Sequence, residues 1–391
     1  MTKGDAEEIG SMLDWAAGQG LAWCLFSTEA MDPEEVCGPR GYPRPAACVH
    51  SADIPEGRKR GSPLWVEVAA QRLGVKHHEL FYMGGSARDW RSAINAGVFY
   101  VHAAWGDELP SNCKAYKAGS AADFRLMLEH FLLGEPSWAY AGGGQGWELR
   151  CLLPAGASLP CTAPGTSFTL QDVLTYKKEV KIGGTDARNV LMLSVLANAY
   201  LEGLMSPGAL MCIYPSSRPG EVSDRLSGYF RPASHLFRSY YKEDLLIRGR
   251  QALDTSRERV KAKRESRPSG VSIATQATSV HVGERYAAPG KLKGKTVIVA
   301  DDFTTQGMSL DWARTLLTAA GAARVILLAI GKYGRPEHTA YTPQAEIAPY
   351  RLGALEAGDF TQSAVPLRHD TGAEARMRER FGRLLPLLAG E

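Results

Sequence analysis

Two adjacent carboxylates, Asp301 and Asp302, follow an apolar run at 297–299 and precede a short segment of hydroxyl, amide and glycine residues at 304–309. The run has no polar face, so it predicts a buried strand of a parallel sheet, and open α/β sheets bind ligands where such strands end. The amides at the N-terminus of the helix expected next favour a phosphate. The two acids repel phosphate but accept hydrogen bonds from sugar hydroxyls, with Mg²⁺ nearby. The pattern predicts a ribose phosphate site; the alternative is an ordinary βα turn that happens to be acidic.

Residues 296–309 resemble the phosphoribosyl diphosphate (PRPP) signature of type I phosphoribosyltransferases, in which an apolar strand and two acids precede a Thr-Thr-Gly-x-Thr loop. The matching residues are Asp301, Asp302, Thr305, Gly307 and Ser309, whereas Ala300, Phe303, Thr304 and Gln306 depart from the usual choices. The resemblance implies that the two catalytic acids hold the ribose hydroxyls. It also implies that the 5′-phosphate is bound by Thr304, Thr305, Gln306, Gly307, Met308 and Ser309. Gln306 replaces a hydroxyl; its amide can still donate, so we expect PRPP binding, and turnover is the open question.

A second apolar run, 209–214, ends in a loop rich in small residues at 215–220. In type I phosphoribosyltransferases the first core strand ends in a loop that receives pyrophosphate, and this segment resembles it. The resemblance implies that pyrophosphate is bound by Ser216, Ser217, Arg218 and Gly220. Small residues let backbone amides approach an anion, and the guanidinium can add charge-assisted hydrogen bonds. The alternative is an ordinary turn of Pro and Ser.

Basic residues crowd the segment 248–267, namely Arg248, Arg250, Arg257, Arg259, Lys261, Lys263, Arg264 and Arg267. The segment is similar in position and charge to the mobile hood that closes over PRPP in type I enzymes. The alternatives are a solvated helix face and a nucleic-acid patch. Arg248 and Arg250 flank a glycine and are candidate base or ligand contacts. Lys332 and Tyr333, after the next predicted buried strand at 325–330, are further candidates by the same resemblance.

Residues 12–106 read as a second α/β unit, which resembles the later part of a haloacid-dehalogenase-type (HAD) phosphatase. The resemblance places Ser27 or Thr28 at the phosphate hydroxyl, Lys59 at the basic position, and 84–89 at the Gly-Asp-x-x-x-Asp metal loop. Gly85 stands where the first acid of that loop belongs, and no Asp-x-Asp nucleophile precedes the strand expected from residue 21. Phosphatase chemistry would then lack both the nucleophile that attacks the phosphate and the carboxylates that hold the charge-neutralising Mg²⁺. We expect a degenerate, non-catalytic domain with a binding or interface role; the alternative is an unrelated flavodoxin-like layer.

The remaining segments set the expected organisation. A glycine turn at 142–146 between two apolar runs predicts a β-hairpin and lacks the spacing of a dinucleotide loop. Helical spacing predicts helices over 185–205, 223–241 and 309–320 and from residue 372 onward. We therefore expect an α/β protein of three segments: a degenerate HAD-like (Rossmannoid) domain at 1–110, a connector with the hairpin at 111–183, and a phosphoribosyltransferase-like parallel sheet flanked by helices at 184–391.

Composition bounds the partners. The 391-residue chain is 45% hydrophobic and 22% charged, and its net charge of +3 is too small to favour a nucleic-acid partner. No apolar run approaches the roughly 18 residues that a membrane helix needs, and the N-terminus does not resemble a signal peptide. Seven scattered cysteines and nine scattered histidines indicate no metal site, and the cysteines suggest reduced thiols in the cytoplasm.

These patterns lead to one principal expectation. The chain would be a PRPP-dependent phosphoribosyltransferase in which a nitrogen of a base-like acceptor displaces pyrophosphate, with Mg²⁺ held mainly by PRPP. The family is often dimeric, so a homodimer is the implied assembly. The first alternative is a non-catalytic PRPP- or nucleotide-binding sensor or regulatory protein, and a weaker one is a nucleic-acid role through 248–267.

Overall fold

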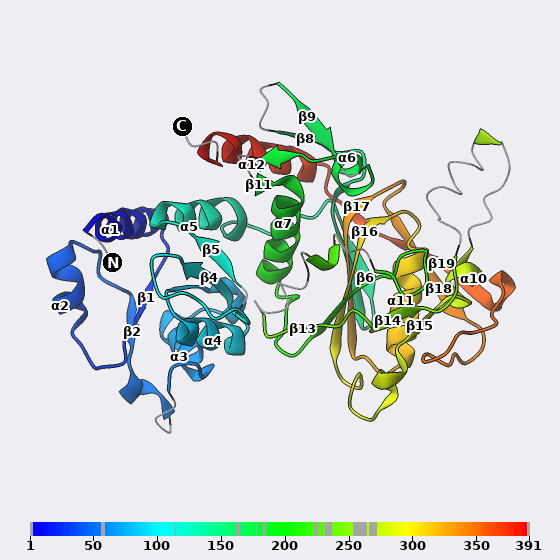
Figure 1. Cartoon of the computed structure of the whole chain (residues 1–391), viewed down its shortest axis with the longest axis horizontal. Helices are drawn as coiled ribbons and strands as arrows, with labels where there is room; N and C mark the ends of the chain where they lie inside the picture. Colours follow the sequence, from blue (N-terminus) through cyan, green and yellow to red (C-terminus); the bar gives the residue numbers. More distant parts are fainter. Residues whose placement is uncertain are drawn as a thin grey trace. The chain divides into compact units, whose positions relative to one another are not determined.

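The computed structural model describes residues 3–55, 59–113, 115–161, 165–176, 178–182, 185–222, 226–228, 230, 237–252, 264–265 and 272–388 (Figure 1). Most of the basic segment expected to form a hood, and most of the helix expected over 223–241, lie outside these residues. The chain forms two compact units that interleave along the sequence. Unit 1 comprises 1–136, 196–208 and 232–239, and unit 2 comprises 137–195, 209–231 and 240–391.

Unit 2 is built on a seven-stranded sheet. Its strands, in spatial order, are β13 (Tyr240–Tyr241), β12 (Leu210–Ile213), β16 (Thr296–Thr304), β17 (Arg324–Lys332), β7 (Trp147–Pro154), β6 (Tyr140–Gly144) and β20 (Arg368–His369). The first five strands are mutually parallel, and the last two run antiparallel to their neighbours. The expected α/β class with a parallel sheet is thus present. The carboxyl ends of β12, β16 and β17 lie at one edge of this sheet.

Apolar residues bury both faces of the central strands. Val297, Ile298 and Val299 of β16 are fully buried, as expected for a parallel strand covered on each side. Helix α11 (Met308–Ala319) follows β16 directly and packs Leu310, Ala313, Leu316 and Leu317 into the core on one face. The apolar residues of this helix recur at three- and four-residue spacing, which gives it one apolar face. The helix starts shortly after the acidic end of β16.

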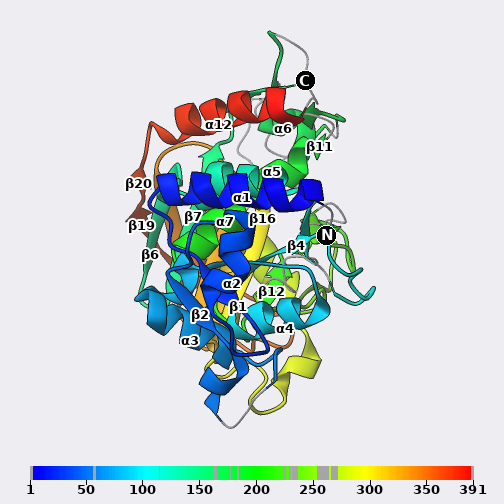
Figure 2. The same ribbon diagram turned by 90° about the vertical axis from the view of Figure 1, so that its left-hand side faces the viewer.

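The other elements of unit 2 surround this sheet. They are β8 (Ser158–Pro160), β9 (Ser167–Thr169), α6 (Leu170–Leu174), β10 (Lys181–Ile182), β11 (Thr185–Asp186), β14 (Leu246–Arg248), α10 (Ile273–Ala277), β15 (Val280–Val282), β18 (Glu337–Pro343), β19 (Phe360–Pro366) and α12 (Ala373–Leu388). Helix α12 lies against β8, β10 and β7 (Figures 1 and 2). Helix α7 (Ala187–Leu201) begins in unit 2, and its residues from 196 onward belong to unit 1.

The expected hairpin is present as β6 and β7. It is an integral part of unit 2, because β7 pairs in parallel with β17, and the two compact units therefore differ from the three consecutive segments expected. Pairing across more than 170 residues, such as Val325 with Trp147, leaves no local signal in the sequence.

Unit 1 contains two small parallel sheets. One pairs β1 (Cys24–Phe26) with β2 (Ala47–Val49), and the other has the order β3 (Phe81–Gly84), β4 (Phe99–Ala103), β5 (Tyr116–Ala118). The helices are α1 (Lys3–Gly18), α2 (Pro33–Cys37), α3 (Leu64–Leu73), α4 (Ala87–Ala96) and α5 (Ala121–Met127). The ring of Phe26 stacks on that of Tyr82, with centroids 5.1 Å apart, so the end of β1 packs against β3.

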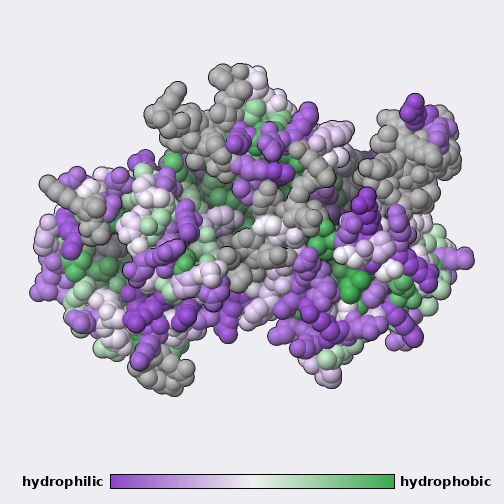
Figure 3. Space-filling view, viewed as in Figure 1, coloured by the Kyte–Doolittle hydropathy of each residue, from purple (hydrophilic) through white to green (hydrophobic). Residues whose placement is uncertain are grey.

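On the face drawn in Figure 3 hydrophilic residues predominate, and apolar residues form small, separate patches. Within the described part of the chain, no helix combines the length and the apolar character needed to cross a membrane.

Candidate functional site

The acid pair ends β16 at the carboxyl edge of the sheet of unit 2. Both side chains are half-buried, and each caps the backbone that follows: Asp301 Oδ1 accepts the amide of Asp302 at 2.9 Å, and Asp302 Oδ1 accepts the amide of Phe303 at 2.7 Å. Burial, and next the charge of Asp302, raise the pKa of Asp301 well above its usual value. Donors or a cation brought by a ligand would relieve this unfavourable pair.

The turn between β16 and α11 carries three successive amides whose adjoining carbonyls are held by other groups. The carbonyls of Thr305, Gln306 and Gly307 accept hydrogen bonds from Lys332 Nζ at 2.6 Å, the Thr339 amide at 2.9 Å and the Asp311 amide at 2.7 Å, respectively. The peptides are trans, so each following N–H points opposite to the carbonyl it adjoins. The N–H groups of residues 306, 307 and 308 therefore point away from the donors that hold the carbonyls. Such successive amides bind anions.

Glycine is required at position 307 for two reasons. Its φ of +94° lies in the left-handed region, and a Cβ there would stand 2.1 Å from His338 Nδ1. This residue is the N-cap of α11, and no side chain caps the helix there. The first amides of a 12-residue helix thus remain available to an external anion, which the helix dipole favours.

The other residues expected to bind the 5′-phosphate lie differently. Thr304 and Met308 are buried, and the carbonyl of Thr304 accepts the amide of Tyr333 at 2.8 Å. Ser309 is half-buried in the first turn of α11, and Gln306 is exposed. Of the six residues expected at the phosphate, the turn therefore offers its backbone together with the exposed Gln306 and the half-buried Thr305 and Ser309 side chains.

The loop at 215–220 lies beside the acid pair because β12 runs parallel to β16. Ile213 pairs with Ala300, and the Tyr214 amide donates to the Ala300 carbonyl at 3.0 Å. The loop closes through the Ser216 amide, which donates to the Glu221 carbonyl at 3.0 Å. Ser217 is half-buried, Gly220 is exposed with a φ of +70°, and the exposed Arg218 lies 3.8 Å from Glu221. The structure therefore brings this loop and the acids to one edge.

Arg248 supports the loop at 215–220 from within unit 2. It is buried, and its guanidinium donates to the Ser216 carbonyl, to Ser279 Oγ at 2.5 Å and to Gln276 Oε1 at 3.2 Å. These bonds occupy the guanidinium, so the structure makes Arg248 a support of the loop where the sequence suggested a ligand contact. Gln276 and Ser279 were missed because no motif surrounds them. Arg250 is exposed.

Lys332 is likewise a support. Only 3% of its surface is exposed, burial lowers its pKa, and Nζ donates to the Thr305 carbonyl and to the Tyr333 carbonyl at 3.2 Å. Tyr333 itself is half-buried; its ring lies 5.2 Å from that of Phe303, and its hydroxyl accepts from Gln171 Nε2 at 2.8 Å. Gln171 comes from a segment in which the sequence indicated no chemistry.

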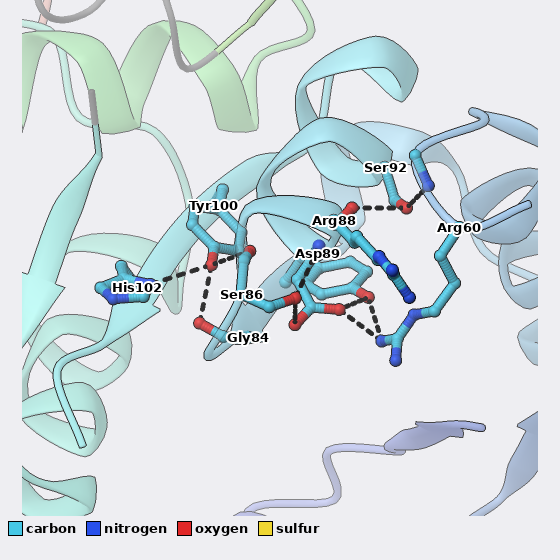
Figure 4. A network of polar contacts seen from close by, with 10 residues as sticks. Arg60, Gly84, Ser86, Arg88, Asp89, Ser92, Tyr100 and His102 are labelled. Atoms are coloured by element: carbon cyan, nitrogen blue, oxygen red, sulfur yellow. Dashed lines mark hydrogen bonds and ion pairs between the residues drawn. The ribbon is translucent and has the colours of Figure 1, made fainter. Parts of the chain in front are cut away.

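In unit 1 the acid of the loop matched to a HAD metal loop is paired with a basic residue of the same unit (Figure 4). Asp89 is 7% exposed and forms an ion pair with Arg60; its Oδ1 accepts from the Tyr82 hydroxyl at 3.0 Å and its Oδ2 from Ser86 Oγ at 2.7 Å. The basic position is corrected by one residue, because Lys59 is exposed and Arg60 makes the contact. Ser27 follows β1, and its Oγ accepts the Glu29 amide at 3.2 Å; the Thr28 carbonyl accepts from Ser51 Oγ.

Gly85 of the same loop packs against backbone. A Cβ at position 85 would lie 3.1 Å from Gly106 Cα, and the Gly85 carbonyl accepts the Asp107 amide at 2.6 Å. The neighbouring Gly84 carbonyl accepts from the Tyr100 hydroxyl at 2.7 Å, and that hydroxyl lies 3.2 Å from His102 Nδ1. The position expected for a metal-binding acid is therefore filled by main chain. Across the described ranges, no three His, Cys, Asp or Glu side chains are grouped so as to hold a metal ion.

No protein-family model matches the chain, and no curated protein matches it. Among solved structures, it is similar in part to a HAD-superfamily hydrolase from Ehrlichia chaffeensis, at 20% identity and a TM-score of 0.24. The likeness covers 29% of this chain and 53% of the hydrolase, so the chain spans about half the length of that protein. A likeness this weak and partial carries no argument about activity and does not bear on the resemblance to phosphoribosyltransferases.

Proposed function

We propose that unit 2 binds PRPP at the carboxyl edge of its parallel sheet and transfers the phosphoribosyl group to a nitrogen of a base-like acceptor. The observation that carries this proposal is the combination at the end of β16: two adjacent carboxylates followed by three successive amides whose adjoining carbonyls are held by other groups. Few ligands need both, because the acids favour hydroxyl groups or cations and the amides favour an anion. A sugar phosphate presents hydroxyls and an anion on one small molecule.

The 5′-phosphate would lie on the amides of residues 306–308, at the N-terminus of α11. The exposed Gln306 side chain can add a donor there, in place of the hydroxyl that the signature normally has. The ribose hydroxyls would donate to Asp301 and Asp302. Such donors favour the ionised form of Asp301, against burial and the charge of Asp302, which raise its pKa in the ligand-free protein.

Pyrophosphate would lie against the loop at 216–220, within reach of Arg218. Asp301 and Asp302 alone suit Mg²⁺ only if most of its ligands come from phosphate oxygens and water, which is how proteins usually bind this ion. When bound, Mg²⁺ would neutralise charge on the leaving pyrophosphate. The C1–O bond to pyrophosphate breaks and a C1–N bond forms; the protein contributes positioning and charge stabilisation and no nucleophile.

The test is calorimetric titration of the full chain with PRPP in the presence of Mg²⁺, together with pyrophosphate release in a panel of purine and pyrimidine bases. Binding with turnover of one base is the expected result. Binding without turnover of any base would favour the sensor, for which the replacement of a hydroxyl by Gln306 is the supporting observation. Lack of PRPP binding would overturn the proposal.

A further inference from the structure

A buried polar cluster lies directly beneath the turn at Gly307. Asp311 of α11 is completely buried, and its carboxylate accepts from Arg314 Nε at 2.7 Å and Nη2 at 3.1 Å, from His338 Nε2 at 3.1 Å and from the Tyr341 amide at 2.7 Å. Hydrogen bonds and charge from His338 and Arg314 outweigh burial, which acts in the opposite sense, and hold the pKa of Asp311 below its usual value. The cluster therefore ties the first turn of α11 to β18.

His338 is the member of this cluster that touches the turn. It is 1% exposed, and its Nε2 donates to the Asp311 carboxylate. Among the described residues, the other ring nitrogen, Nδ1, has no hydrogen-bond partner. This nitrogen faces Gly307, since a Cβ there would be 2.1 Å from it. The imidazole fills the space that a side chain at position 307 would take. Buried polar atoms without partners are rare, so this one calls for an explanation.

The orientation of Asp311 has a second consequence. An acid in the first turn of a helix usually lies near the helix amides and dipole, where it would compete with an external anion. Here the carboxylate is turned toward β18 by His338 and the Tyr341 amide, and Arg314 offsets its charge. The first amides of α11 consequently keep their attraction for a ligand.

We propose that His338, held by Asp311, is a positioning residue for the anion-binding turn of unit 2, and that it acts on the phosphomonoester end of the ligand. The proposal rests on the proposed function. The imidazole supports Gly307 in its left-handed conformation from below, while Lys332 and the Thr339 amide hold the two preceding carbonyls. Its removal opens space beneath the turn and takes a donor from Asp311, so the turn that carries the amides of residues 306–308 loses its support.

Calorimetry with three ligands tests this role: PRPP with Mg²⁺, ribose 5-phosphate, and pyrophosphate with Mg²⁺. His338→Leu should lower the affinities for PRPP and ribose 5-phosphate about tenfold, because the buried Asp311 carboxylate loses a donor and the turn loses its support. Pyrophosphate, which would lie on the loop at 216–220, should bind as in the wild type. His338→Gln keeps an amide donor for Asp311 and should restore most of the affinity.

The matched control is Glu148→Gln, which breaks the ion pairs of Glu148 with Arg150 and Arg324 at the opposite, amino-terminal ends of β7 and β17. It should lower the unfolding temperature and leave all three affinities unchanged. A His338→Leu variant that binds ribose 5-phosphate like the wild type, or that loses all three ligands equally, would overturn the positioning role while the proposed function stands. A wild-type chain that binds none of them would overturn both.

A double-mutant cycle gives an independent reading. Gly307→Ala should weaken ribose 5-phosphate more in the wild type than in His338→Ala, where the ring that meets the new Cβ is gone. Some loss remains in both backgrounds, since the left-handed conformation disfavours alanine. Additive effects on affinity would contradict a contact that sets the turn.

Discussion

The two units place acids in similar local settings and treat them in opposite ways. In each, a parallel strand, β16 or β3, ends in a turn that leads into a helix. In unit 1, Asp89 accepts from Arg60, Tyr82 and Ser86, and its charge is balanced within the protein. In unit 2, Asp301 lies against a second carboxylate and its pKa is raised. An acid that the protein satisfies serves the fold, whereas an acid kept in an unfavourable pair is typical of a binding site.

Glycine contributes to the same difference. Gly85 admits the main chain of Gly106 at the position where a HAD-type metal loop has its first acid. Gly307 makes room for His338 and leaves the start of α11 without a side-chain cap. At Gly85 the missing side chain lets main chain occupy the loop, whereas at Gly307 it leaves the amides at the start of α11 accessible to a ligand.

The largest expected effect comes from removing both acids of unit 2. Asp301→Asn with Asp302→Asn should reduce PRPP affinity at least 100-fold, because two charge-assisted acceptors for ribose hydroxyls are lost and each contributes about 1.5–3 kcal/mol. Calorimetry with Mg²⁺ measures this change. The matched variant in unit 1, Asp89→Asn, should bind PRPP as the wild type does. If both variants bind normally, the contrast between the two acid sites has no functional meaning.

The second effect concerns stability and reverses the contrast. Asp89→Ala leaves Arg60 without its carboxylate partner, and breaking a buried ion pair typically costs about 3 kcal/mol. Urea unfolding followed by tryptophan fluorescence should show this loss. Arg88→Ala is the control: Arg88 precedes Asp89 in the chain and is exposed, so its removal should change the free energy of unfolding little (Figure 4). Equal stabilities for the two variants would mean that the Asp89 network contributes nothing to the fold.

The sequence was informative where local order decides the outcome. A strand at 297–299 and a helix at 309–320 were predicted, because an apolar run and a helical period are local properties; in the structure the strand extends over Thr296–Thr304 and the helix over Met308–Ala319. The supporting roles of Arg248 and Lys332 were missed. Each side chain is buried because it donates to a carbonyl of another segment, that of Ser216 or Thr305. A basic residue near a predicted anion site reads as a ligand contact unless those distant partners are known.

His338 and Asp311 were missed for a related reason. In the sequence, Asp311 is one acid in a helix and His338 one of nine scattered histidines. Only the packing of β18 on α11 brings them together beneath Gly307. The parallel pairing of β7 with β17 is equally non-local, and it places the predicted hairpin in the main sheet.

A smaller effect follows from the pKa of Asp301. The folded-state pKa lies above the unfolded value of about 3.9, so this group contributes stability below pH 3.9 and the contribution is lost as pH rises through the folded-state pKa. At pH 7, Asp301→Asn should therefore be more stable than the wild type by about 1 kcal/mol in the free energy of unfolding, and it should unfold at a higher temperature. The difference should shrink toward pH 4. Thermal unfolding of both proteins between pH 4 and 8, without ligand, measures it; a difference that does not vary with pH would exclude the strained pair.

The smallest effect separates two neighbouring residues of unit 1. Lys59 is exposed, so Lys59→Ala should change the free energy of unfolding by no more than about 0.5 kcal/mol. Arg60→Lys keeps the charge yet should cost more, because the guanidinium bonds both Asp89 and the Tyr82 hydroxyl, and a lysine has no planar fork with which to reproduce that geometry. Urea unfolding of the two variants decides between them. A larger loss of unfolding free energy for Lys59→Ala would mean that Lys59, and not Arg60, is the basic partner in this loop. Asp89 would then lack its internal partner, as Asp301 does, and the contrast between the two acid sites would be lost.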